Sequence, residues 1–115
     1  MTPDQFRLEM ASYRQSVHDE ASSQKSPYIA LERLRTLYGK FDANERGMAD
    51  QVLSEWVLSE DEGVRFDALA LIYDLKIDAA VSALHALETR LALSAAPSAP
   101  YELKKVRRVF AQLAG

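Results

Sequence analysis

Residues 59–72, SEDEGVRFDALALI, carry the strongest structural signal in the chain. Asp61 or Glu62 suits the start of a helix, where an acidic side chain can accept free backbone N–H groups and complement the helix dipole. Apolar side chains then recur at helical spacing, at Val64, Ala68, Leu71, Ile72 and Leu75. The stretch therefore predicts an amphipathic helix over residues 62–75.

Residues typical of helix starts and of loops also occur on both sides of this stretch. Asp42 and Glu45 have the spacing of a capping box, and Asp78 is placed to cap a fifth helix. The Pro-containing segment 94–100 is the clearest loop, and no segment alternates apolar and polar residues as a strand does. We predict an all-α chain of about six helices, near residues 3–18, 27–38, 43–58, 62–75, 78–93 and 99–113. The polar stretch from Asp19 to Ser26 is expected to end the first helix.

A spacing of 36 residues repeats along the chain. It separates helix starts near Ser26, Glu62 and Ser98, and each start is followed by apolar residues at i, i+3 and i+7. These stripes are Leu31/Leu34/Tyr38, Ala68/Leu71/Leu75 and Leu103/Val106/Phe110. A fixed period of this length indicates a helical solenoid, and an ordinary bundle with helices of similar length is the alternative.

The central region also resembles a known family. Residues 59–72 are similar to the first helix of a HEAT-type repeat, in which an acidic turn precedes a Val-Arg pair and then alanines and leucines. Residues 76–84 resemble the turn and second helix of that repeat, and the resemblance covers residues 59–93. It implies a short HEAT-like α-solenoid of stacked antiparallel hairpins, forming one domain over residues 1–115. It further implies that Asp61 and Arg65 make polar contacts between repeats.

The amino-acid composition indicates which cellular compartment to expect for this protein. Hydrophobic residues make up 48% of the chain, enough for a core, and cysteine is absent, which excludes disulfides and thiolate chemistry. Residues 1–6 lack the basic start and apolar run of a signal peptide, and no apolar stretch reaches the length of a membrane span. We expect a cytoplasmic protein without a membrane partner.

Catalytic patterns are sparse. The two histidines and absent cysteines argue against a zinc site, and the scattered glycines form no phosphate-binding loop. His85 and Glu88 lie one turn apart, which could begin an acid–base or metal site but is also ordinary for a polar helix edge. We therefore expect no enzyme activity, no metal and no cofactor.

Charge is distributed unevenly. Residues 42–90 carry eleven acidic and four basic side chains, and such a surface attracts basic proteins and repels phosphate. A non-catalytic protein-binding module is expected, whose general character is similar to small bacterial immunity and antitoxin proteins that neutralise basic toxin nucleases. The expected partner-binding residues are Asp50, Glu55, Glu60, Asp61, Glu62, Asp67 and Asp74, with Phe66 and Tyr73 as possible aromatic anchors.

Two alternatives remain open. One is a small scaffold or regulatory subunit that self-associates as a homo-oligomer, since Leu8 and Val109 lie off the main apolar stripes. The other, less favoured, is a nucleic-acid binder that uses the cations of the last helix. These are Lys104, Lys105, Arg107 and Arg108, and no aromatic residues interleave with them in the sequence.

Overall fold

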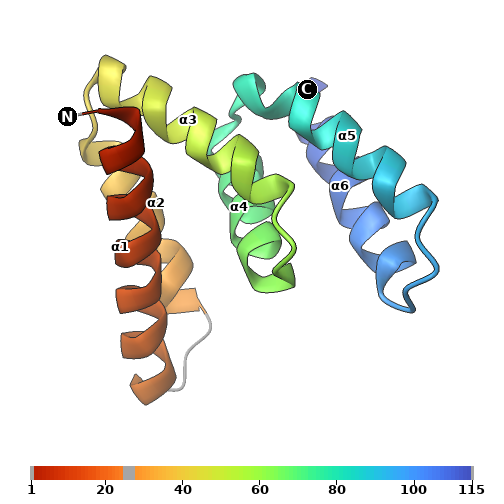
Figure 1. The fold of residues 1–115 in the computed structure, drawn as a ribbon, viewed down its shortest axis with the longest axis horizontal. Coiled ribbons are helices and arrows are strands. Elements are labelled where there is room, and N and C mark those ends of the chain that lie inside the picture. The colour runs from red at the N-terminus through yellow and green to blue at the C-terminus, as the bar shows by residue number, and fades with distance from the viewer. Residues whose placement is uncertain (1, 25–27, 115) are drawn as a thin grey trace. The chain divides into compact units, whose positions relative to one another are not determined.

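The computed structural model describes residues 2–24 and 28–114, and for residues 21–24 the backbone alone. Every regular element in this part of the chain is a helix, which confirms the all-α prediction there. Figure 1 shows α1 (Pro3–Gln24), α2 (Tyr28–Lys40), α3 (Ala43–Val57), α4 (Glu62–Leu75), α5 (Val81–Ala92) and α6 (Ala99–Ala114). A short 3₁₀ turn, η1 (Asp78–Ala80), precedes α5.

The helix predicted over residues 62–75 coincides with α4, and the predicted ends of four other helices lie within two residues of the observed ends. The predicted end of the first helix is wrong, because α1 continues to Gln24. Its polar end is held by side chains: Gln15 donates to Asp19 at 3.0 Å, and Arg33 of α2 donates to Glu20 at 2.8 Å. The predicted starts at Ser26 and Pro27 lie outside the described residues.

Side-chain caps explain where α3 and α4 begin. Asp42 and Glu45 form the predicted capping box, with Asp42 N–H donating to Glu45 Oε1 at 3.0 Å and Glu45 N–H donating to Asp42 Oδ1 at 2.8 Å. Asp61 caps α4 by accepting Val64 N–H at 3.1 Å, as predicted. The prediction for Asp78 is wrong, because this residue lies inside η1 and no side chain caps either η1 or α5.

Contacts divide the chain into two compact units, Met1–Val52 and Leu53–Gly115. In the first unit, α1 and α2 lie side by side (Figure 1). Their buried residues include Phe6, Val17 and Leu34, and the Phe6 and Phe41 rings meet at 5.1 Å between centroids. The expected single domain over residues 1–115 stays a prediction.

In the second unit, α6 packs against both α5 and α4. Leu71, Ile72, Leu84, Leu87 and Val106 are fully or almost fully buried. The three predicted stripes are all buried or half-buried, with Leu34, Leu71 and Val106 at their centres. The helical face pattern was therefore predicted correctly from the sequence.

Candidate functional site

A shallow groove runs between α4 and α6 in the second unit. Its larger hollow encloses about 180 Å³, with Phe66, Ala70 and Tyr73 of α4 on one side and Lys105, Arg108 and Val109 of α6 on the other. A smaller hollow of about 50 Å³ adjoins it and shares Phe66, Leu69 and Lys105. We call this surface the α4–α6 groove.

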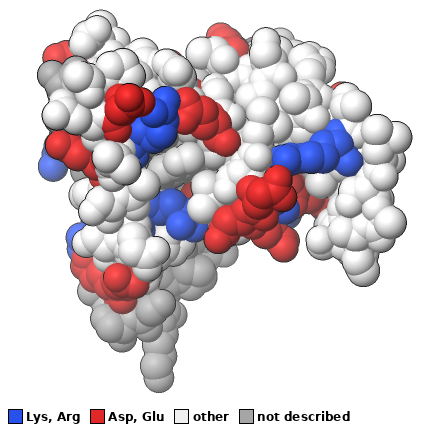
Figure 2. All heavy atoms as spheres, in the orientation of Figure 1, with Lys and Arg blue, Asp and Glu red and all other residues white. Residues whose placement is uncertain are grey.

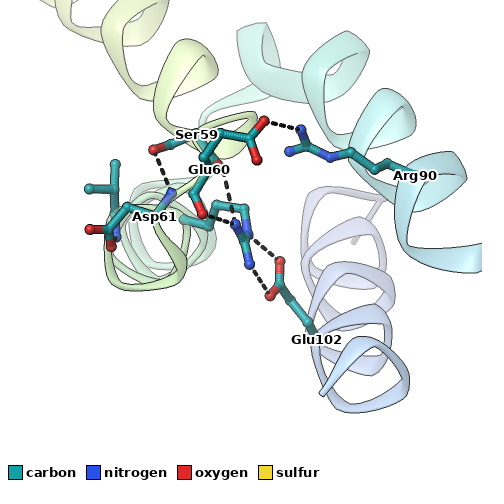
Figure 3. Close-up of polar contacts among 7 residues, drawn as sticks. Ser59, Glu60, Asp61, Arg90 and Glu102 are labelled. Atoms are coloured by element: carbon teal, nitrogen blue, oxygen red, sulfur yellow. Dashed lines mark hydrogen bonds and ion pairs between the residues drawn. The ribbon is translucent and has the colours of Figure 1, made fainter. Parts of the chain in front are cut away.

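An ion pair holds the two helices in register near their starts. Arg65 of α4 makes two hydrogen bonds to the carboxylate of Glu102 in α6, at 2.7 and 2.9 Å (Figure 3). Nη1 of the same guanidinium donates to the carbonyl oxygens of Ser59 and Glu60 at 3.0 and 3.1 Å. Hydrogen bonding to Glu102 raises the pKa of Arg65 above its ordinary value.

A second contact fixes the far end of the same helix pair. Gln112 of α6 donates to the carbonyl oxygen of Tyr73 at 3.4 Å. Because Arg65 meets Glu102 and Tyr73 meets Gln112, α4 and α6 run in the same direction. The groove therefore lies between two helices whose relative register is set at both ends.

The predicted aromatic anchors both line the groove. Phe66 is 46% exposed, and the ammonium of Lys105 lies 4.8 Å from its ring centroid. Tyr73 is half-buried. The structure adds Tyr101, which is 70% exposed and lines the smaller hollow. A cation above an aromatic face is favourable, so Lys105 helps to hold the exposed ring in place.

Three consecutive predicted acids, Glu60, Asp61 and Glu62, are exposed at the start of α4. Asp61 is engaged as the helix cap, and Glu62 lines the smaller hollow. Glu60 points toward Arg90 at 3.8 Å with its side chain 99% exposed (Figure 3). Of these three acids, only Glu62 lines the groove, whereas Glu60 and Asp61 are exposed nearby at the start of α4.

The other predicted acids differ from one another in burial and in their contacts. Asp67 is 2% exposed, so its interpretation as a docking residue is wrong: its position in α4 faces the core. Glu55 and Asp74 are exposed, and each interacts within the chain. Figure 2 shows acidic and basic side chains close together on the face it draws, rather than acidic ones alone.

Asp50 belongs to the first unit and accepts the hydroxyl of Tyr38 at 2.8 Å. Burial, followed by this hydrogen bond, raises the pKa of Tyr38 to about 12. Asp50 therefore has a local role in joining α2 to α3.

The cations of the last helix separate into two kinds. Lys105 and Arg108 line the groove beside Phe66 and Tyr73, whereas Arg107 lies 3.8 Å from Glu88. The sequence shows no aromatic residues among these cations, but α4 supplies them from about 35–40 residues away. These cations and aromatic residues are far apart in the sequence, and they come together because α4 and α6 pack side by side in parallel.

The structure adds little support for the other functional residues considered in the sequence. His85 Nδ1 lies 3.9 Å from Glu88, and its ring stacks on Phe110 at 4.6 Å between centroids. Within the described residues, no three His, Asp or Glu side chains form a group that could hold a metal ion. None of the helices in those residues is long and apolar enough to cross a membrane. Val109 is buried, whereas Leu8 is 71% exposed.

Comparison of the chain with protein-family models, with curated proteins and with solved structures found no match.

Proposed function

We propose that this chain is a non-catalytic, cytoplasmic protein-binding module that docks a basic partner at the start of α4 and along the α4–α6 groove. The partner's basic residues meet Glu60 and Glu62, and an apolar side chain enters beside Phe66. In this role the chain acts as an inhibitor of the immunity or antitoxin type, with a toxin nuclease as the best candidate for its partner.

One observation carries this proposal: the groove combines an exposed aromatic ring with the exposed carboxylate of Glu62 at one end and cations along one side. Exposed aromatic residues beside a hollow are typical anchors of protein interfaces. A rim of both signs suits another protein, whose surface also carries both signs, better than a polyanion.

We further propose that α4, η1, α5 and α6 form one and a half repeats of a short HEAT-like stack. Equivalent helices of such a stack run in the same direction, one repeat apart. The contacts of Arg65 with Glu102 and of Tyr73 with Gln112 join residues 37 and 39 positions apart, close to the expected 36. Arg65 would then make a contact between repeats, while Asp61 caps its own helix.

A second candidate function is binding of single-stranded nucleic acid. It is favoured by Lys105 and Arg108 beside Phe66 and Tyr73, because stacking on aromatic rings next to cations is how such strands are held. The carboxylates at the start of α4 oppose it, since they repel phosphate.

A tagged pull-down from a lysate of the source organism tests the proposal, with bound protein and nucleic acid identified in parallel. We expect one stoichiometric basic protein, lost from the Glu60→Lys/Glu62→Lys variant, which leaves the Asp61 cap intact. The control Glu32→Lys/Asp78→Lys makes the same charge change at exposed positions and should retain the partner.

The alternatives give different results in the same assay. Nucleic acid alone, lost from Lys105→Glu/Arg108→Glu, would replace the proposal with the second candidate. Recovery of the chain itself, with no other protein, would indicate a self-associating scaffold. A basic protein retained equally by all variants would refute docking at the start of α4.

A further inference from the structure

A second hollow lies in the first unit. It encloses about 140 Å³ between α1, α2 and the start of α3. Its lining includes three aromatic rings, of Phe6, Tyr13 and Phe41, and two carboxylates, of Glu9 and Glu45. We infer that this hollow binds an arginine side chain of the basic partner, an inference that rests on the proposed function for the partner's charge.

The aromatic lining is set by helical spacing and by packing. Phe6, Glu9 and Tyr13 follow one another at intervals of three and four along α1, so they share one face of that helix. Phe6 is buried, and its ring packs against Phe41 at 5.1 Å with the planes tilted by 58°. Aromatic faces attract cations, and the flat guanidinium of arginine stacks on them better than the ammonium of lysine.

The two carboxylates supply the charge complementarity. Glu45 is held in place because one of its oxygens accepts Asp42 N–H at 3.0 Å, which leaves the other oxygen available to a ligand. Glu9 is exposed, and no hydrogen bond or ion pair to its side chain occurs within the described residues. Two carboxylates beside an aromatic lining match the cationic head and apolar stem of an arginine.

Two cations that are close in sequence to the lining residues make contacts elsewhere. Arg46 lies over the Tyr38 ring at 5.6 Å and donates to the carbonyl oxygen of Gly39 at 3.3 Å. Arg7 pairs with Asp4 at 2.6 Å. Neither side chain lines the hollow, so its carboxylates are not neutralised from inside it.

Amide NMR shifts of the full ¹⁵N-labelled chain would test this inference. The probe is the capped tripeptide acetyl-Gly-Arg-Gly-amide, and the matched control replaces its arginine with citrulline, which has nearly the same shape without the charge. We expect saturable shifts along residues 6–13 and near residue 45 with the arginine probe only. The dissociation constant should be of millimolar order, as for a single anchored side chain.

Glu9→Gln should weaken binding of the probe about fivefold, because it removes one ion pair at an exposed position where no fold contact is lost. Glu45→Gln removes the negative charge but keeps an oxygen that can accept the Asp42 N–H. Any weakening of probe binding in this variant is therefore due to the lost charge and not to loss of the helix cap. Equal shifts with citrulline, no shifts, or shifts confined to residues 60–62 would each overturn the inference. Because these measurements need no natural partner, their failure is distinct from failure of the pull-down.

Discussion

The Glu102→Ala substitution should destabilise the second unit more than any other change to a charged side chain in the α4–α6 groove. The side chains of Arg65 and Glu102 are only 15% and 9% exposed, and their two hydrogen bonds join α4 to α6. Removing the carboxylate leaves a largely buried guanidinium without its counter-charge. Losing one partner of a buried pair costs about 3–5 kcal/mol, and the carbonyl oxygens of Ser59 and Glu60 still accept from Arg65. We therefore expect the lower end, about 3 kcal/mol.

Urea unfolding followed by the fluorescence of Trp56, the only tryptophan, would measure this loss. Trp56 is buried and belongs to the second unit. Glu60→Ala is the control, because the side chain of Glu60 is almost fully exposed, and it should leave the midpoint unchanged. The double variant Arg65→Met/Glu102→Leu should recover most of the stability, since apolar replacements leave no buried charge. A loss below about 1 kcal/mol for Glu102→Ala would refute this account of the pair.

Three further predictions concern local structure. Asp61→Ala should cost about 1 kcal/mol in urea unfolding, whereas Asp61→Ser, which can still cap α4, should cost much less; equal losses would contradict the capping role. Lys76→Gly should raise stability by about 1 kcal/mol in the same assay, because Lys76 has a left-handed backbone with φ of 53°, and a loss would contradict the expected strain. The pKa of Tyr38 is raised from 10.0 to about 12 in the folded chain. The folded state is therefore stabilised by neutral Tyr38 below pH 10, and this stabilisation is lost as the pH rises toward 12. Ultraviolet titration should show one late tyrosine that Tyr38→Phe removes and Asp50→Asn shifts to lower pH, and a late tyrosine that persists in Tyr38→Phe would contradict the assignment.

Much of the fold was predictable because its signals are local. The capping box of Asp42 and Glu45 and the cap at Asp61 involve residues three positions apart, and the buried stripes follow from helical periodicity. The end of α1 was missed for the opposite reason. Its polar residues are held by Arg33, which lies thirteen positions beyond Glu20 in the sequence. The sequence likewise gives no sign that Asp78 would enter a 3₁₀ turn.

The candidate site was less predictable, because it depends on pairs of distant residues. Phe66 was identified from its position off the buried stripe, and it is exposed. Asp67, its neighbour, was grouped with the surface acids from its charge alone, although it is buried. Glu102 was not singled out, because one acid among four bases suggests a solvated helix, whereas its partner is Arg65, 37 residues earlier. The aromatic residues beside Lys105 and Arg108 were missed for the same reason.

The most direct test of docking at the start of α4 is amide hydrogen exchange of the chain, free and in complex with the basic protein recovered by pull-down. The account predicts added protection at residues 60–66 and 101–108 in the complex, with little change along the buried core of α5. Protection confined to other segments, with residues 60–66 exchanging as in the free chain, would contradict the proposed docking surface.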